Sequence, residues 1–169
     1  MDIRVLKVVE ETTVDGPGFR NSVYCAGCLH ACPGCHNPQS WSMNGGEPYT
    51  VDELAGQLLA DPFADVTFTG GDPLYQAEAF GELARRIKAE STKTIWVYTG
   101  FLWEELVNEE KYANLLKHID VLVDGPFVAA RRNENLHFRG SDNQRIIDVP
   151  ASLRKGEVVL SGYHSPHTF

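Results

Sequence analysis

The sequence predicts an α/β fold: an open, partial β/α barrel built on a mainly parallel sheet. Short apolar runs rich in β-branched residues recur along the chain, and amphipathic helical patterns separate several of them. Parallel strands need crossover connections, which such helices supply, and the units are too few for a closed eight-stranded barrel. The predicted strands are Ile3–Val9, Asn21–Cys25, Asp65–Thr69, Thr94–Tyr98, Ile119–Asp124, Arg145–Val149 and Glu157–Leu160.

Helices are predicted between these runs. Thr50, followed three residues later by Glu53, has the pattern of a capping box and begins a helix that extends to about Ala60. The next helix, about Tyr75–Glu90, has an apolar stripe that predicts packing on the sheet, formed by Phe80, Leu83, Ala84 and Ile87. A third, broken helical region covers Trp103–Val107 and Lys111–His118.

Length and composition indicate one soluble globular domain over residues 1–169. Apolar residues make up 43% of the chain, no internal repeat or linker divides it, and the formal charge is −8. The acidic excess argues against general nucleic-acid binding, which needs basic residues to neutralise phosphates. No signal peptide and no apolar run of ~18 residues is visible, so we expect a cytoplasmic protein without membrane contact and with a flexible tail at about 162–169.

All four cysteines lie between Cys25 and Cys35, within a loop at 25–36. In a chain without an export signal, such clustering favours metal binding over disulfides. The spacing Cys28-x3-Cys32-x2-Cys35 suits three thiolate ligands of a [4Fe-4S] cluster, with the fourth iron open to a substrate or cofactor. A four-thiolate zinc site is the alternative, although the two cysteine pairs are only three residues apart. A cluster that also used Cys25 would close the open iron, and Cys25, at a strand end, also suits a buried thiol.

Polar residues follow three of the predicted strands. Gly70-Gly71-Asp72 is either a glycine turn that opens the next helix or a ligand site, because glycines let the backbone approach a ligand and a carboxylate accepts hydrogen bonds from an ammonium group. Thr99 and Asp124 end the next two strands, where a parallel β/α fold exposes its reactive face, or they serve as turn and cap residues. The segment Arg139–Arg145 is either a turn or a polar loop that contacts a ribose or a protein backbone.

The cysteine spacing resembles the Cys-x3-Cys-x2-Cys motif of radical S-adenosylmethionine (SAM) enzymes. The resemblance implies the partial barrel of that superfamily and a reduced cluster that cleaves SAM, bound at the open iron, to a 5′-deoxyadenosyl radical. Gly70-Gly71-Asp72 resembles the Gly-Gly-Glu motif that holds the methionyl amine, with either the Asp72 side chain or the backbone making the contact. The positions carried over to SAM are Gly34, Cys35, His36, Gly70, Gly71, Asp72, Thr99 and Asp124. Gly34 stands where many members have an aromatic residue near the adenine, and Thr99 and Asp124 could instead form a cation site like that of a related activase.

Further segments select a subfamily. Asp15–Arg20 is similar to a segment of glycyl-radical activating enzymes. The loop Gly27–Pro38, together with Thr69–Leu74, Trp96–Phe101, Asp120–Phe127 and Arg139–Arg145, resembles the activating proteins of anaerobic ribonucleoside-triphosphate reductases. This resemblance implies that the protein generates a glycyl radical on the large catalytic subunit of such a reductase, without a general base and with a low-potential electron donor such as flavodoxin or ferredoxin. The alternatives are activation of another glycyl-radical enzyme, of the formate-lyase type, and a non-enzymatic Fe–S or zinc module.

Two further side chains receive predictions of their own. Arg20 either is solvated or contacts a partner or a carboxylate. His30 lies inside the cysteine loop, and we expect its side chain to be exposed, whereas His36, directly after the last cysteine, is the better candidate for a site residue.

Overall fold

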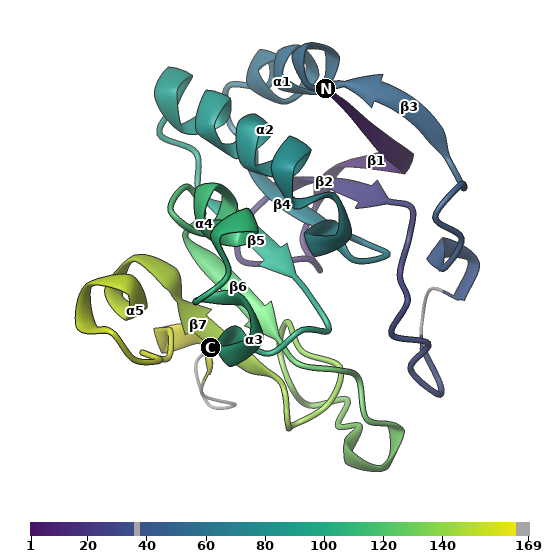
Figure 1. Ribbon diagram of the computed structural model, residues 1–169, viewed down its shortest axis with the longest axis vertical. Helices are drawn as coiled ribbons and strands as arrows, with labels where there is room; N and C mark the ends of the chain where they lie inside the picture. The colour runs from purple at the N-terminus through teal and green to yellow at the C-terminus, as the bar shows by residue number, and fades with distance from the viewer. Residues whose placement is uncertain (36–37, 165–169) are drawn as a thin grey trace.

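The structure is a computed structural model that describes residues 1–35 and 38–164, and its centre is an open seven-stranded sheet (Figure 1). The strand order is β3-β1-β2-β4-β5-β6-β7. The strands are β1 (Asp2–Thr12), β2 (Arg20–Cys25), β3 (Glu47–Thr50), β4 (Asp65–Gly70), β5 (Ile95–Tyr98), β6 (Val121–Asp124) and β7 (Arg145–Asp148).

The four central strands β2, β4, β5 and β6 are parallel, and the outer strands are antiparallel to their neighbours. The predicted α/β class and open sheet are therefore confirmed, while parallel pairing is limited to the centre. No α-helix lies between β1 and β2 or between β6 and β7, where the connection holds only a short 3-10 turn at Ala129–Arg131, and antiparallel neighbours do not need a crossover helix.

Two of the strand predictions need correction. The edge strand β3 was not predicted, because it is short and contains Pro48, a residue that edge strands tolerate. The predicted strand Glu157–Leu160 is wrong: only Leu160 forms an isolated bridge, to Ile147. The amide of Val159 donates to the Ser152 hydroxyl (2.8 Å) instead of a ladder partner, so the segment follows β7 without forming a strand.

The helices are α1 (Val51–Ala60), α2 (Ala77–Glu90), α3 (Trp103–Leu106), α4 (Glu110–Leu116) and α5 (Val149–Lys155). The capping box that begins α1 is confirmed: the Glu53 amide donates to Thr50 Oγ1 (3.0 Å), and the Thr50 amide donates to the Glu53 carboxylate (3.1 Å). Helix α5 was not predicted, although Asp148 caps it, Pro150 lies in its first turn and Gly156 ends it. None of the described helices combines the length and apolar character needed to cross a membrane.

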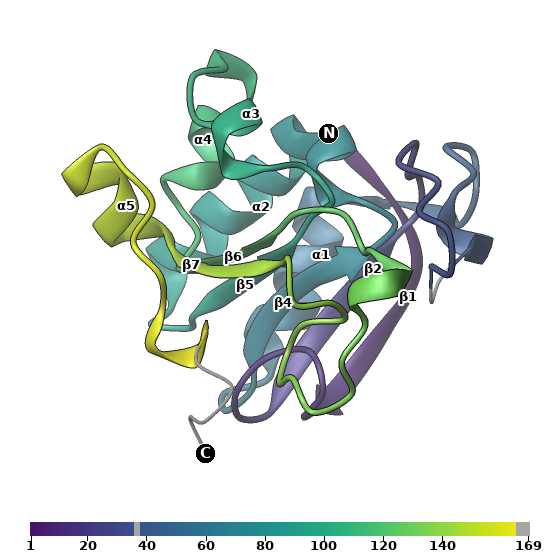
Figure 2. The same ribbon diagram turned by 90° about the horizontal axis from the view of Figure 1, so that it is seen from below.

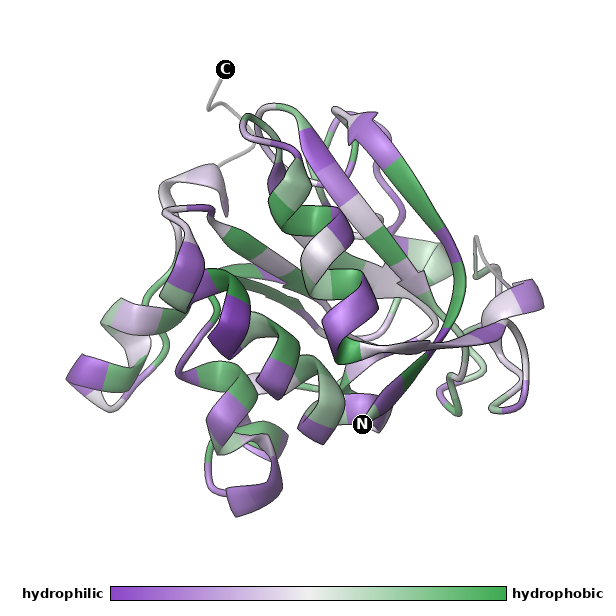
Figure 3. Cartoon of the chain, turned by 90° about the horizontal axis from the view of Figure 1, so that it is seen from above, coloured by the Kyte–Doolittle hydropathy of each residue, from purple (hydrophilic) through white to green (hydrophobic). Residues whose placement is uncertain are grey.

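Helices α1, α2 and α4 cover one face of the sheet (Figure 1) and enclose the main core with it. The predicted stripe of α2 is confirmed, because all four of its apolar side chains are fully buried. In Figure 3 these helices alternate between hydrophobic and hydrophilic bands, as expected for elements with one apolar face. The helices therefore cover this side of the sheet.

The opposite face has a smaller core of Trp96, Val121, Val123 and Ile146, against which Phe138 packs. Figure 2 shows the long segment between β6 and β7 beside the loop that joins β1 to β2. Arg20 lies buried on this face, 1% exposed, and donates to Thr67 Oγ1 (2.8 Å) and to the carbonyls of Val66 and Thr94. The Arg20 side chain therefore stabilises the sheet by hydrogen bonds to β4 and to the residue before β5, and the alternative of a solvated arginine is wrong.

Candidate functional site

A cavity of about 430 Å³ lies at the carboxyl ends of the central strands. Its wall combines the cysteine loop, the ends of β4, β5 and β6, and the segment between β6 and β7. Residues that line it include Cys28, His30, Cys32, Cys35, Gly70, Gly71, Asp72, Tyr98, Thr99, Gly100, Phe127, Arg139 and Gln144. The cysteine motif and the Gly-Gly-Asp segment, far apart in the sequence, therefore face one space.

The four cysteines divide into two groups by burial. Cys28, Cys32 and Cys35 are half-buried and line the cavity, whereas Cys25 is fully buried at the end of β2. Burial raises the pKa of the Cys28 thiol to about 11, and burial raises the pKa of Cys25 well above its ordinary value. The geometry therefore supports Cys25 as a thiol of the core and the other three cysteines as ligands.

Within the described part of the chain, no three His, Cys, Asp or Glu side chains converge on one point as ligands of a single metal ion would. A four-iron cluster takes its thiolates at separate iron atoms, so its ligands do not share one centre. Three half-buried cysteines that face a cavity fit this donor set. His36, the other predicted site residue of the loop, lies outside the described residues.

The Gly-Gly-Asp segment follows β4 and lies against the chain that leads into the cysteine loop. Gly70 has a φ of +98°, and a Cβ there would lie 2.4 Å from the Cys25 amide nitrogen. The Gly71 amide donates to the Cys25 carbonyl (2.8 Å), and the Asp72 amide donates to the Gly27 carbonyl (2.8 Å). The glycines therefore permit a close approach between two segments of this protein's own backbone.

The Asp72 carboxylate is 1% exposed and accepts four hydrogen bonds. The Leu74 amide donates to Oδ1 (3.0 Å), while Oδ2 accepts from Thr99 Oγ1 (2.8 Å), the Gly100 amide (2.9 Å) and His30 Nε2 (2.7 Å). Both oxygens are already used, so the Asp72 side chain links the cysteine loop, Thr99 and Gly100 within the cavity wall.

His30 is a site residue that the sequence reasoning missed. Its side chain is only 16% exposed, so the expectation of an exposed histidine is wrong. The ring lies against Phe101, with centroids 4.6 Å apart, and near Tyr75, with centroids 5.5 Å apart. Its hydrogen-bond partner, Asp72, lies 42 positions away in the sequence, so no local sequence pattern could predict this contact.

Thr99 and Asp124 have different surroundings. Thr99 lines the cavity and donates to Asp72, but Asp124 does not line it. The fully buried Asp124 carboxylate accepts from Arg145 at both oxygens (3.0 and 2.6 Å) and from the Trp103 amide (2.8 Å). Asp124 is thus neutralised by Arg145 and fixes the start of α3.

Two polar atoms in the cavity wall are buried without a hydrogen-bond partner among the described residues: the Tyr98 hydroxyl and Arg139 Nε. Both are donors, and burying an unpaired donor is costly, so a ligand with acceptor atoms suits this wall. The other nitrogens of Arg139 donate to the carbonyls of Gln144 (2.9 Å) and His164 (2.8 Å), which hold its guanidinium in place.

Gly34 lies at the exposed turn of the cysteine loop with a φ of +76°. A Cβ on Gly34 would lie 3.4 Å from the Phe127 ring, which lines the cavity. The Phe127 ring thus lies beside the backbone of Gly34.

Comparison with known proteins assigns the chain to a family. Residues 14–147 match the family model described as a 4Fe-4S single cluster domain. A Vibrio cholerae protein named anaerobic ribonucleoside-triphosphate reductase-activating protein is 38% identical over 142 residues, or 79% of this chain and 90% of the relative. Proteins of the same name from Enterobacteria phage T4 and Escherichia coli K12 are 39% and 37% identical, over 79% and 78% of this chain and 86% and 89% of their own lengths.

The chain belongs to the family of anaerobic ribonucleoside-triphosphate reductase-activating proteins.

This membership confirms the resemblance seen in the sequence, and the family model confirms a 4Fe-4S domain. The matched region, residues 14–147, begins before the cysteine loop and ends within β7, so it contains each cavity residue named above. The site described from geometry thus lies within the part of the chain that matches the family model.

Proposed function

We propose that this protein is the radical SAM activase of an anaerobic ribonucleoside-triphosphate reductase, with one [4Fe-4S] cluster held by Cys28, Cys32 and Cys35. One observation carries the proposal: these three cysteines and the Gly70–Asp72 segment line the same cavity. The names of the relatives indicate the reductase as the partner. Under this proposal the open sheet is the partial barrel of the radical SAM type.

When bound and reduced, the cluster would supply the electron for SAM cleavage, and this radical chemistry would serve to remove a hydrogen atom from a glycine of the reductase. The residues of this chain bind and orient. Cys28, Cys32 and Cys35 would hold the cluster, and the backbone of Gly70, Gly71 and Asp72 would contact SAM, while the Asp72 side chain stays bonded to Thr99 and Gly100. No side chain is needed as a general base.

The remaining contacts to SAM follow from the cavity wall. We assign Tyr98 and Arg139 as donors to acceptor atoms of the cofactor, because each has a buried N–H or O–H directed to no described partner. Phe127 offers an aromatic face near Gly34. Gly34, Cys35 and His36 stay as proposed backbone contacts, Thr99 as a residue of the wall, and Asp124 as a support for α3.

The partners in this proposal are the large catalytic subunit of the reductase and a low-potential donor such as flavodoxin or ferredoxin. We place the reaction in the cytoplasm, without nucleic acid or membrane. A net charge of −8 agrees with a protein whose partners are not phosphate backbones.

The test is anaerobic. The protein is reconstituted with iron and sulfide, reduced and mixed with SAM, and 5′-deoxyadenosine is measured together with the glycyl-radical signal of an added reductase. Formation of both supports the proposal. A colourless protein that binds zinc, or a reduced cluster whose spectrum ignores SAM, contradicts it. A glycyl radical on a formate-lyase-type enzyme, but not on the reductase, would retain the chemistry and replace the partner.

A further inference from the structure

We infer that His30 is a positioning residue that fastens the cysteine loop to the ends of β4 and β5 through Asp72. The relevance of this link to SAM rests on the proposed function, whereas the link itself is a property of the chain. His30 lies between Cys28 and Cys32, so fixing its ring fixes the stretch of loop that joins these two cysteines.

The hydrogen bond between His30 and Asp72 is short and protected from water. His30 Nε2 lies 2.7 Å from Asp72 Oδ2, with the two side chains 16% and 1% exposed. A carboxylate oxygen accepts, so Nε2 carries the proton and donates. Hydrogen bonds to a charged group are among the stronger ones in proteins, and burial removes the competing water.

Asp72 is a fixed anchor that does not depend on His30. If His30 were lost, Oδ2 would still accept from Thr99 Oγ1 (2.8 Å) and the Gly100 amide (2.9 Å), and Oδ1 from the Leu74 amide (3.0 Å). The dependence therefore runs in one direction: removing the ring releases the loop while the carboxylate stays in place.

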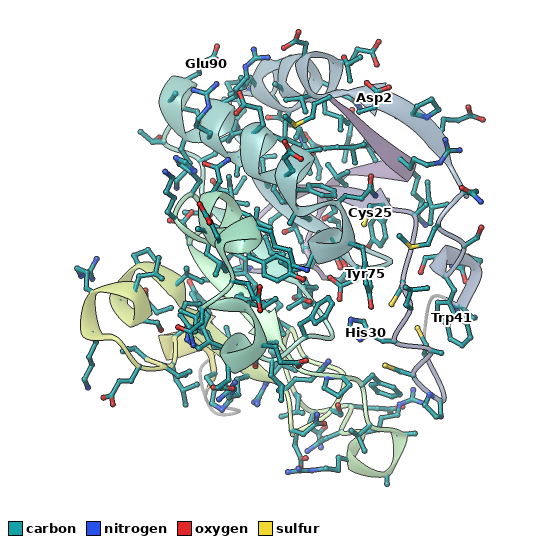
Figure 4. The ribbon with its side chains drawn as sticks, viewed as in Figure 1. Asp2, Cys25, His30, Trp41, Tyr75 and Glu90 are labelled. Atoms are coloured by element: carbon teal, nitrogen blue, oxygen red, sulfur yellow. The ribbon has the colours of Figure 1, made fainter. Side chains whose placement is uncertain are left out.

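The ring fits a slot with three walls. Phe101 and Tyr75 contact it, and Figure 4 shows His30 directed from the loop toward Tyr75. Gly100 closes the third side, because a Cβ there would lie 2.7 Å from His30 Cδ2 and 2.9 Å from Nε2. Gly100 has no positive φ that would require glycine, so the space taken by the ring is the reason for its small size.

The backbone next to His30 is consistent with a loop held under constraint. Ala31 has a φ of +49°, in the left-handed region that a residue with a Cβ seldom adopts. Such a conformation needs support from its surroundings. The His30 contacts on one side and the turn from Cys35 N to the Cys32 carbonyl (3.0 Å) on the other provide it.

These contacts join the two parts of the cavity wall. The Asp72 carboxylate binds His30 of the cysteine loop, and the Asp72 amide binds Gly27 before that loop. The loop and the end of β4 are therefore joined at two points, one on each side of Cys28. His30 therefore sets the distance between the thiolates and the backbone that faces the cavity.

The test uses three variants and one control. His30→Gln keeps a side-chain N–H donor, His30→Leu removes it, and Gly100→Ala displaces the ring without changing His30. Leu29→Ala is the control, because Leu29 lies in the same loop and is 66% exposed. Amide hydrogen exchange of a peptide covering residues 26–35 is measured on the reduced, cluster-free protein, together with the urea midpoint. The midpoint potential of the reconstituted cluster is measured next.

We expect His30→Leu and Gly100→Ala to raise exchange in the loop by at least about tenfold, the scale of one lost hydrogen bond to a charged group, and to shift the cluster potential. His30→Gln and Leu29→Ala should stay near the wild type. Loop exchange in His30→Leu equal to the wild type, or His30→Gln as impaired as His30→Leu, would overturn the inference. The hydrogen-exchange experiment needs no SAM. If the wild type failed to cleave SAM, the proposed function would be refuted, but the exchange rates would still test the role of His30.

Discussion

Replacing Gly70 by alanine tests whether the Gly-Gly-Asp segment needs glycine because the backbone of this protein approaches it closely. A Cβ at Gly70 would lie 2.4 Å from the Cys25 nitrogen and 2.6 Å from the Cys25 carbonyl oxygen, both backbone atoms that no rotamer change can move. Gly156 has a similar positive φ, +77°, but nothing lies within 4 Å of its Cβ position. The pair therefore separates conformational strain from steric contact.

The expected magnitudes follow from these two terms. A left-handed conformation costs a residue with a Cβ about 1–2 kcal/mol, so Gly156→Ala should lower the free energy of unfolding by about that amount. Gly70→Ala adds the displacement of β4 from β2, which costs about 1–3 kcal/mol as overpacking and weakens the bond from the Gly71 amide to Cys25. We expect a loss of about 2–5 kcal/mol in total.

The assay is urea unfolding of the reduced, cluster-free protein, followed by circular dichroism and analysed with a common slope. Iron content after reconstitution is measured in parallel, because a displaced β4 also displaces the start of the cysteine loop. If Gly70→Ala and Gly156→Ala destabilise the protein equally, within about 0.5 kcal/mol of each other, the close approach carries no energy and the reasoning fails.

Three further predictions concern the cysteines and the buried ion pair. Replacing Cys28, Cys32 or Cys35 by serine should abolish cluster binding and SAM cleavage, while Cys25→Ser should keep most of both activities. Loss of iron in the Cys25 variant alone would contradict the ligand assignment. Arg145→Met should lower the free energy of unfolding in urea by about 3 kcal/mol, because it leaves the Asp124 carboxylate buried and unpaired. Arg131→Met, which breaks an exposed ion pair, should lower it by under about 1 kcal/mol. Equal losses in the two variants would refute the importance of burial for this ion pair. Burial raises the pKa of Cys28 to about 11, so less of this thiol is ionised at a given pH. The rate of Cys28 alkylation in the cluster-free protein, followed by mass spectrometry, should therefore rise roughly tenfold per pH unit to near pH 11. A rate that reaches its plateau by about pH 9 would contradict the raised pKa.

Local patterns in the sequence predicted the features that depend on neighbouring residues. The cysteine spacing and the Thr50–Glu53 capping box are of this kind, and so is the apolar stripe of α2. The amino-acid pattern of α5 was also present, since Asp148 precedes Pro150 and Gly156 follows, but its seven residues contain little helical periodicity. Short elements are therefore the part of the fold that periodicity misses.

Side-chain direction could not be predicted, because it depends on partners remote in the sequence. Asp124 is the last residue of β6 and Thr99 directly follows β5, yet only Thr99 lines the cavity, because Asp124 is bound by Arg145, 21 positions away. His30 was expected in solvent because it lies inside the cysteine loop. Its true partner becomes visible only once β4 and β5 lie side by side.

The cysteine motif and the Gly-Gly-Asp segment are one structural unit, and this changes how substitutions in either should be interpreted. The Gly71 and Asp72 amides donate to the carbonyls of Cys25 and Gly27, which precede Cys28, and the Asp72 carboxylate accepts from His30, which follows it. A change in the glycine segment therefore shifts the thiolates even if no ligand is present. Loss of SAM cleavage in such a variant does not by itself identify a cofactor contact. Only a variant that retains iron content and loop exchange, yet loses SAM cleavage, assigns a residue to the cofactor.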